Sequence, residues 1–233
     1  MTENKIELSV ILPAYHEEEN LRNLLPRLLT TLQLMGIQFE ILVIDTLESA
    51  DQTKEVCEEY GVRHIARRGG NYFGCAVRTG IDEARGHFVL FMDADGSHPP
   101  EFIPELFCFV GKFDVVIASR YVDQGGTENA FALILMSKIL NWTFSIFLNL
   151  PCKDVSNSFK IYRNEQLKSI KLSFNNFDIV EELLFKLHRR NPLIQFKEVP
   201  FVFKKRMFGE TKRNLFLFIL TYIYTIAKLR FRA

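Results

Sequence analysis

Two aspartates with one residue between them stand at the end of an apolar run of the chain. Asp93 and Asp95 follow the stretch 87–92, and a glycine, a serine, a histidine and two prolines come next. Burying either carboxylate without a partner would be costly, so the pair belongs at the mouth of a strand, near a cation or hydrogen-bond donors. Two carboxylates offer the oxygen ligands that Mg²⁺ and Mn²⁺ prefer. Such an ion would stabilise a diphosphate as a leaving group.

The same residues also have a purely structural interpretation. An Asp-x-Asp tripeptide is short, and Asp95-Gly96 is typical of a turn, so the tripeptide alone favours a turn. Its place at the end of a buried strand, before a helix that Pro99 and Pro100 open, favours the metal site instead. His98 lies near this site, and we assign it no catalytic role.

Strands alternate with helices along the chain. Four short apolar runs without polar alternation predict strands that are covered on both faces, at residues 9–13, 40–45, 88–93 and 114–119. Leucines at helical spacing between the first two strands, and a second apolar helical pattern at 77–84, predict the intervening helices. The pattern predicts an α/β fold with a Rossmann-like, mainly parallel sheet and helices on both faces.

Polar residues follow the ends of all four predicted strands. In a doubly wound sheet, ligands bind outside the carboxyl ends of the strands. The residues at or just after these ends are Pro13, Tyr15, Asp45, Asp93, Asp95 and Arg120. The chain has no GxGxxG after its first strand and no GxxxxGK[ST], which argues against a dinucleotide fold and a P-loop. Something other than a glycine-rich phosphate cradle must hold the ligand.

The composition is that of a folded domain. The chain has 233 residues, of which 48% are hydrophobic, enough for a sizeable core. Its four cysteines are far apart and form no CxxC pair, so neither a zinc site nor a disulfide framework is indicated, and a reducing cytosol fits. No basic-then-apolar leader follows Met1, which argues against a secretory signal. We expect a cytoplasmic protein.

The net charge of +1 hides an asymmetry. Residues 185–233 contain 12 Lys and Arg against 2 Glu, a local charge of +10, which leaves −9 for residues 1–184. This split indicates an anionic partner for the C-terminal part. Because the basic residues alternate with long apolar stretches, they favour a phospholipid surface or a lipid phosphate over nucleic acid.

Two apolar segments predict association with a membrane. Residues 130–150 are interrupted by Lys138, Asn141 and Asn149, and residues 215–227 are only 13 long. Both segments therefore suit helices that lie in the interface better than helices that cross it. Residues 214–233 would form an amphipathic tail on a catalytic domain at 1–213, at the cytoplasmic face of the membrane. The alternative is that these helices pack on the domain itself or on a partner chain.

Several longer motifs follow one another along residues 6–213. They are VILPAYHEEENL (10–21), AVRTGIDEARGHFVLFMDAD (76–95), HPPE (98–101), SRYVDQGGTEN (119–129), KDVSNSFKIYR (153–163) and VPFVFKKRMFGETK (199–212). Together these motifs resemble the family 2 glycosyltransferases with the GT-A fold. Their order is the one found in the polyprenyl (dolichyl) phosphate sugar transferases, a group that includes dolichol-phosphate mannose synthase.

The resemblance implies a nucleotide site and a metal site. Pro13, Tyr15 and Glu17 match positions that hold the base and ribose, and Asp45 matches an aspartate that ends the second strand. Asp93 and Asp95 match the metal-binding pair, with Asp95 the stronger candidate for direct coordination of Mg²⁺ or Mn²⁺, and Asp93 is also a candidate nucleotide-binding residue. Tyr15 and Glu17 also have structural alternatives, as a strand-end aromatic and a helix-start carboxylate.

The resemblance also implies a phosphate site. Arg120 matches an arginine that faces the donor and acceptor phosphates, and Arg206 and Lys212 match a phosphate-binding loop in which Gly209 and Thr211 also correspond. For Arg206 and Lys212 the alternative is a solvated basic loop. Glu182 matches an acidic position and either orients the acceptor or faces solvent on an amphipathic helix.

Three positions depart from the family pattern. Thr46 follows the second strand where the family has a second aspartate, Ser97 stands where mannose-type members carry glutamine, and Ile134 lies in an apolar stretch where an arginine is expected. Ser97 is accordingly a third candidate metal ligand, through its hydroxyl or a water molecule.

The resemblance implies an inverting transferase that moves a mannose- or glucose-type hexose from a GDP- or UDP-linked donor to a polyprenyl phosphate. A lipid phosphate is already anionic, so it needs cations that hold it but no general base. Two alternatives stay open: a related transferase acting on a glycan hydroxyl, and a catalytically silent module that binds a nucleotide or the membrane. The sugar, the nucleotide and a homo-oligomeric or membrane-protein partner also stay open.

Overall fold

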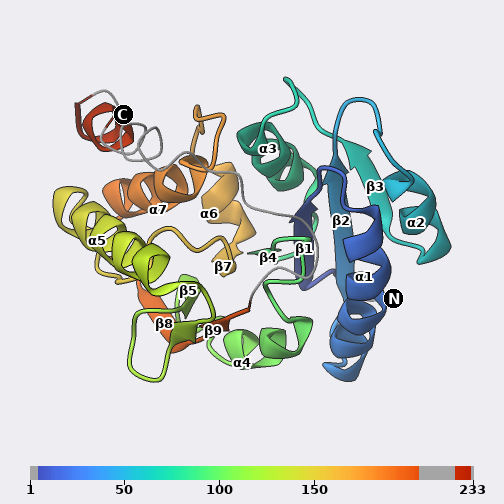
Figure 1. The fold of residues 1–233 in the computed structure, drawn as a ribbon, viewed down its shortest axis with the longest axis horizontal. Helices are drawn as coiled ribbons and strands as arrows, with labels where there is room; N and C mark the ends of the chain where they lie inside the picture. The colour runs from blue at the N-terminus through green and yellow to red at the C-terminus, as the bar shows by residue number, and fades with distance from the viewer. Residues whose placement is uncertain (1–4, 205–223, 232–233) are drawn as a thin grey trace.

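The computed structural model describes residues 5–204 and 224–231, in which the chain forms a mixed sheet covered by helices (Figure 1). The large sheet has seven strands in the order β3-β2-β1-β4-β7-β5-β8, and β6 pairs with β9 separately. Strand β7 is antiparallel to both neighbours, and all other pairs are parallel. The strands are β1 (Leu8–Pro13), β2 (Phe39–Asp45), β3 (Arg63–Ala66), β4 (Phe88–Phe91), β5 (Val115–Ser119), β6 (Gly126–Thr127), β7 (Lys160–Arg163), β8 (Phe196–Pro200) and β9 (Val202–Phe203).

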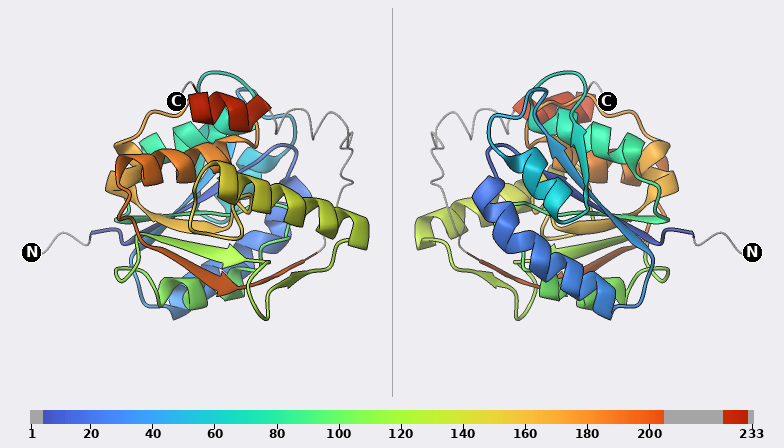
Figure 2. Two further views of the ribbon diagram at one scale, coloured as in Figure 1. Left: turned by 90° about the vertical axis from the view of Figure 1, so that its left-hand side faces the viewer. Right: turned by 90° about the vertical axis from the view of Figure 1, so that its right-hand side faces the viewer.

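Helices lie on both faces of the sheet, and alternate strand residues supply a core to each face (Figure 2). The helices are α1 (Glu18–Leu34), α2 (Thr53–Glu59), α3 (Phe73–Glu83), the 3₁₀ turn η1 (Pro100–Phe102), α4 (Ile103–Phe107), α5 (Phe131–Phe147), α6 (Asn164–Lys168) and α7 (Ile179–Arg190). In β1, Val10 and Leu12 belong to the core that contains residues of α1, α2 and α4, whereas Ile11 belongs to the core that contains residues of α3, α6 and α7. The alternation follows from the two-residue period of a strand.

The predicted α/β architecture is confirmed. The four predicted strands correspond to β1, β2, β4 and β5, and their ends differ from the prediction by no more than 2 residues. The strands β3, β7 and β8 gave no comparable signal, because charged residues such as Arg63, Lys160 and Lys197 interrupt their apolar sequence. The helix predicted after Pro99 and Pro100 is present as η1 followed by α4.

Helix α5, which contains much of the first predicted interfacial segment, is largely uncovered. It buries Asn141 and Phe144, but it leaves most of its large apolar side chains in solvent, with Phe131 80% and Trp142 65% exposed. The helix lies on the outer side of the molecule, away from α1 and α2 (Figure 1). Within the described ranges, no helix has both the length and the hydropathy of a membrane span.

Residues 224–231, in the second predicted interfacial segment, form a helix that docks on the domain with one face. Leu229 is fully buried in the core that α7 shares, and Thr225 Oγ1 donates a hydrogen bond to Asp178 Oδ2 at 3.1 Å. The remainder of the tail predicted at 214–233 lies outside the described residues, so its membrane role stays a prediction.

Gly74, in the first turn of α3, permits close contact between this helix and the 174–175 segment. A Cβ atom at Gly74 would overlap the carbonyl oxygen of Phe174 and lie 2.8 Å from Asn175 Cα. Backbone atoms cannot yield as a flexible side chain can. We therefore expect Gly74→Ala to lower the free energy of unfolding in urea by about 1–3 kcal/mol, despite the better helix propensity of alanine.

Gly126→Ala is the matched control, because no heavy atom lies within 4 Å of a Cβ at Gly126. Its midpoint in urea should stay close to that of the wild type. A Gly74→Ala variant as stable as this control would contradict the packing of α3 described here.

Candidate active site

Asp93 and Asp95 lie just beyond the carboxyl end of β4. The Asp93 side chain is 30% exposed, and its Oδ1 accepts a hydrogen bond from Ser158 Oγ at 2.9 Å. Asp95 is only 4% exposed, and its Oδ1 accepts from the backbone N and the Oγ of Ser97, at 3.0 and 2.6 Å. Gly96, the next residue, has a φ of +80°, which glycine adopts without strain. The pair thus occupies a tight turn that holds both carboxylates at the sheet edge.

Ser97 is fully buried and donates its hydroxyl proton to Asp95. In this arrangement Ser97 orients the carboxylate, and its role as a metal ligand stays a prediction. Among the described residues, no group of three or more His, Cys, Asp or Glu side chains is arranged as a metal cage. Proteins commonly bind Mg²⁺ through only one or two carboxylates, and the phosphates of the substrate and water molecules supply the other ligands. Asp93 and Asp95 agree with this type of site.

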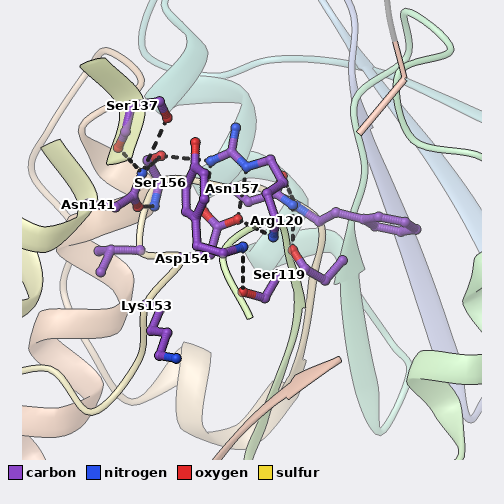
Figure 3. A network of polar contacts seen from close by, with 12 residues as sticks. Ser119, Arg120, Ser137, Asn141, Lys153, Asp154, Ser156 and Asn157 are labelled. Atoms are coloured by element: carbon purple, nitrogen blue, oxygen red, sulfur yellow. Dashed lines mark hydrogen bonds and ion pairs between the residues drawn. The ribbon is translucent and has the colours of Figure 1, made fainter. Parts of the chain in front are cut away.

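Arg120 follows β5 and is held by a buried carboxylate, Asp154 (Figure 3). Its Nε donates to Asp154 Oδ2 at 2.8 Å and its Nη2 to Oδ1 at 2.7 Å, which is the bidentate geometry of a strong ion pair. The Asp154 side chain is fully buried and that of Arg120 is 11% exposed. Burial alone would lower the pKa of Arg120, but the Asp154 carboxylate more than offsets it and raises that pKa. The guanidinium therefore remains charged in a fixed orientation.

The loop that carries Asp154 is itself fixed from two sides. Glu198 on β8 accepts hydrogen bonds from the backbone N atoms of Lys153 and Asp154, both at 2.9 Å. Asn141 on α5 accepts from Ser156 N at 2.8 Å, and its Nδ2 donates to Ser156 Oγ at 2.9 Å (Figure 3). Asn141, which interrupts the apolar sequence of α5, is thus a buried connection between that helix and the site.

Lys160, at the start of β7, supports the same loop. Its side chain is fully buried, and Nζ donates to the carbonyl oxygens of Val155, at 2.9 Å, and Asn157. Burial lowers the pKa of Lys160 to about 8, although the nearby Asp154 carboxylate opposes this shift. The sequence contained Asp154, Asn157 and Lys160 in the KDVSNSFKIYR motif, but nothing in their spacing revealed that they support Arg120.

The residues predicted for the nucleotide lie at the ends of β1 and β2. Tyr15 is exposed, and its ring contacts that of His16 edge-on with centroids 4.5 Å apart. Glu17 stands at the N-cap of α1, where Oε2 accepts from Asn20 Nδ2 at 2.6 Å. Pro13 is the last residue of β1. The exposed ring of Tyr15 is accessible to a nucleotide base. The nucleotide-binding roles of Pro13, Tyr15 and Glu17 stay predictions.

Asp45 is buried and engaged by its own surroundings. Its Oδ1 accepts from Thr46 N at 2.7 Å, and its Oδ2 accepts from Ser49 Oγ at 2.9 Å and lies 3.1 Å from His64 Nε2. Thr46, the departure noted in the sequence, therefore contributes to a local cap on this carboxylate. In this arrangement Asp45 shapes the turn after β2, and direct contact with a nucleotide stays a prediction.

Arg67 is a residue of this region that the sequence did not reveal. It is buried, and its guanidinium donates to the carbonyl oxygens of Asp45, at 3.0 Å, and Ala14. Burial lowers the pKa of Arg67, and the charge of Asp45 opposes that shift. Arg67 thereby joins the ends of β1 and β2, the two strands that carry the predicted nucleotide residues.

Glu182 was predicted either to orient the acceptor or to face solvent. The solvent-facing alternative was wrong. Glu182 is fully buried on α7, where its carboxylate accepts from the backbone N atoms of Ser173 and Phe174 at 2.9 Å each and pairs with Lys186 Nζ at 2.8 Å. With its oxygens occupied in this way, Glu182 closes the loop before α7. The predicted phosphate loop, with Arg206, Gly209, Thr211 and Lys212, lies outside the described residues.

Comparison with known proteins agrees with this architecture. Residues 9–184 match the glycosyl transferase family 2. The chain belongs to this family. It is 36% identical over 234 residues to the dolichol-phosphate mannosyltransferase of Pyrococcus furiosus, an alignment that covers 96% of this chain and 64% of that protein. This chain therefore spans somewhat less than two thirds of the archaeal relative's length.

Two further relatives are covered more completely. The yeast (Saccharomyces cerevisiae) dolichol-phosphate mannosyltransferase is 31% identical over 218 residues, or 89% of this chain and 81% of that protein. The polyprenol monophosphomannose synthase of Mycolicibacterium smegmatis is 31% identical over 219 residues, or 88% of this chain and 80% of that protein. The family predicted from the motifs is confirmed.

Solved structures confirm the GT-A fold. Glucosyl-3-phosphoglycerate synthase from Mycobacterium tuberculosis, crystallised with Mn²⁺, UDP and glucosyl-3-phosphoglycerate, superimposes with a TM-score of 0.71. The similarity covers 96% of this chain and 78% of that one, at 20% sequence identity. The same enzyme was also crystallised with Mg²⁺ and UDP.

The buried ammonium group of Lys160 makes stability depend on pH in a defined window. The pKa of Lys160 lies at about 8 in the folded chain, against an ordinary value of 10.5. Between these values the unfolded chain holds a proton that the folded chain has released, so stability rises with pH. Below pH 8 both states are protonated, and this dependence disappears.

We expect the free energy of unfolding of the wild type to rise from pH 8 to 10 relative to that of Lys160→Met, which has a neutral side chain of similar length. Urea unfolding of both proteins at each pH measures the difference. A difference that stays flat over this range would show that Lys160 titrates normally.

Proposed function

We propose that the chain is an inverting hexosyltransferase that moves a sugar from a nucleotide-sugar donor to a polyprenyl phosphate at a membrane surface. The observation that carries this proposal is the convergence of the Asp93 and Asp95 carboxylates with the charged Arg120 at one sheet edge of a family 2 glycosyltransferase. The names of the relatives, dolichol-phosphate mannosyltransferase and polyprenol monophosphomannose synthase, support this acceptor class and a mannose-type sugar.

Asp93 and Asp95 are the residues that would hold a divalent ion. Their carboxylate oxygens fit Mg²⁺ or Mn²⁺, and the partly exposed Asp93 side chain can be reached from solvent. Such an ion, when bound, neutralises the diphosphate of the donor and favours its departure. Ser97 and Ser158 each donate to one of the two carboxylates, and so fix the orientation of both.

Arg120 suits an anionic acceptor. Its charge is secured by Asp154, and the guanidinium also lies 5.1 Å from the centroid of the Tyr121 ring and 5.6 Å from that of Phe203. A phosphate acceptor is already a nucleophile, so the protein needs to hold it in line with the anomeric carbon rather than remove its proton. We propose that Arg206 and Lys212 complete this grip.

The exposed apolar face of helix α5 is suited to contact with a membrane surface. Its exposed apolar residues include Phe131, Ile139 and Trp142, and a pocket of about 190 Å³ beside it is lined by Trp142, Lys138 and Lys153 together with Tyr121 and Ser145. Aromatic and apolar side chains with lysines at their margin are typical of helices that lie in the headgroup region of an anionic membrane. We propose peripheral binding at the cytoplasmic face through α5 and the C-terminal residues 214–233.

The transfer itself is tested with radiolabelled GDP-mannose, UDP-glucose and UDP-GlcNAc, each with and without polyprenyl phosphate and Mn²⁺ or Mg²⁺. A lipid-linked sugar formed only with metal supports the proposal. A product formed on a glycan hydroxyl supports the related transferase instead. No product with any donor, from a protein that binds nucleotide, would indicate a silent binding module.

We expect Asp95→Asn to lower metal-dependent transfer by about 100-fold or more, because a bound metal contributes several kcal/mol of transition-state stabilisation. Asparagine keeps an acceptor oxygen for Ser97, so the fold should remain intact. Asp82→Asn, at an exposed position on α3, is the matched control and should keep full activity. Wild-type turnover by Asp95→Asn would overturn the metal assignment.

Membrane binding is tested by sedimentation with vesicles that contain phosphatidylglycerol. Replacement of Ile139 and Trp142 by serine should reduce co-sedimentation, because it removes apolar area from the exposed face of α5. Leu34→Ser, at an exposed leucine on α1, is the control. High salt should release part of the wild type. Equal binding by the α5 variant and the control would exclude α5 as the membrane contact.

A further inference from the structure

The ring of His98 is fully buried. It stacks on Phe159 with ring centroids 4.7 Å apart and an interplanar angle of 13°, and it forms edge-to-face contacts with Phe201 and Phe203, with ring centroids 6.1 and 5.5 Å apart. These ring contacts alone do not require an imidazole, because any aromatic ring can make them. Packing therefore does not explain a histidine here, whereas the hydrogen bonds of its two nitrogens can.

Those hydrogen bonds determine where the ring carries its proton. The backbone N–H of Asp93 lies 3.0 Å from His98 Nδ1, and because an N–H can only donate, Nδ1 must accept. On the far side of the ring, Nε2 lies 3.1 Å from Asn157 Oδ1. Only Nε2 then remains to carry the proton that it donates to this oxygen.

The orientation of the Asn157 amide supports the same assignment. One atom of the amide lies 2.6 Å from the carbonyl oxygen of Ala118, which can only accept, so this atom is the NH₂ group. The other lies 3.3 Å from the backbone N–H of Phe159, which can only donate, so it is the oxygen. Four groups thus form one directional chain, from the Asp93 N–H through the imidazole and the amide to the Ala118 carbonyl.

This chain spans the site. At one end, the bond to Asp93 N closes the turn that contains Asp95, and His98 Nε2 also lies 3.9 Å from Asp93 Oδ2. At the other end, Asn157 belongs to the loop whose Asp154 holds Arg120, and its backbone N donates to Asp154 Oδ1 at 3.3 Å. The carboxylates at the end of β4 and the arginine at the end of β5 are therefore joined through one imidazole.

We propose that His98 is a positioning residue, which as a bridge between Asp93 and Asn157 fixes the metal-binding aspartates relative to the Arg120–Asp154 pair. The inference rests on the proposed metal-dependent transfer, but it concerns how this chain builds the site and not which acceptor it uses. Residues behind a metal ligand set its orientation, and their loss commonly weakens metal binding 10- to 100-fold. A merely space-filling His98 would lack that effect.

The tautomer is tested first, on the wild type, by ¹⁵N NMR of protein labelled at histidine. The proposal predicts that His98 has a protonated Nε2 and an unprotonated Nδ1 in the folded protein at neutral pH. A ring protonated at Nδ1, or at both nitrogens, would overturn the proposal, because neither form can accept from the Asp93 N–H. This measurement does not depend on any variant folding.

The effect on the metal is tested by the electron paramagnetic resonance of free Mn²⁺, titrated with protein in the presence of GDP or UDP. His98→Phe keeps the aromatic stack and removes both hydrogen bonds, and it should weaken Mn²⁺ binding about 10-fold or more. His98→Asn keeps an acceptor for the Asp93 N–H and should show a smaller loss. His188→Phe, at a histidine on α7 distant in sequence from these residues, is the matched control and should bind Mn²⁺ as the wild type does.

Asn157→Ala removes the other end of the bridge. Because Asn157 and His98 act through the same hydrogen bond, the double variant should lose clearly less than the product of the two single losses. Independent losses that multiply, or Mn²⁺ binding by His98→Phe equal to the wild type, would overturn the bridge and leave the proposed transfer standing. If the wild type bound Mn²⁺ but made no lipid-linked sugar, the proposed acceptor would fail while the bridge could still be measured.

Discussion

The arrangement of the side chains at the carboxyl edge of the sheet depends on the ion pair between the buried Asp154 carboxylate and Arg120. A charge without solvent must be compensated by donors, and Asp154 accepts from the Nε, Nη2 and backbone N of Arg120 as well as from Asn157 N. Because these donors come from the end of β5 and from the loop before β7, the carboxylate fixes two segments at once. An arginine that would otherwise sample many rotamers is presented in one orientation, with its charge secured.

The direction of β7 explains how that loop reaches the site. In a wholly parallel sheet, the segment entering a strand lies at the amino edge, far from the ligand. Because β7 is antiparallel, its first residue, Lys160, pairs with Phe91 near the end of β4 and with Ile117 near the end of β5. The preceding residues 153–158 therefore lie at the carboxyl edge, between the aspartates and Arg120. One reversed strand thus supplies the Ser158 contact to Asp93, the Asn157 bridge and the Asp154 partner.

The sequence predicted the parallel strands β1, β2, β4 and β5, but it did not predict the antiparallel strand β7 or the role of the loop before it. Apolar runs such as that in β1 reveal buried strands, and the polar residues after them predict the edge at which a ligand would bind, which is why Asp93, Asp95 and Arg120 were predicted as site residues. Strand β7 begins with a buried lysine whose ammonium group donates to two carbonyl oxygens, so its pattern is not that of a core strand. The role of its loop follows from pairing direction, which hydrophobic periodicity does not encode.

The metal site is tested most directly by the anomalous diffraction of Mn²⁺ in crystals grown with Mn²⁺ and a nucleoside diphosphate. We expect a single strong anomalous peak at the end of β4, within coordination distance of a carboxylate oxygen of Asp93 or Asp95 and of the diphosphate. A nucleotide bound at this edge with the Mn²⁺ peak elsewhere, or a diphosphate held without contact to either aspartate, would contradict this expectation.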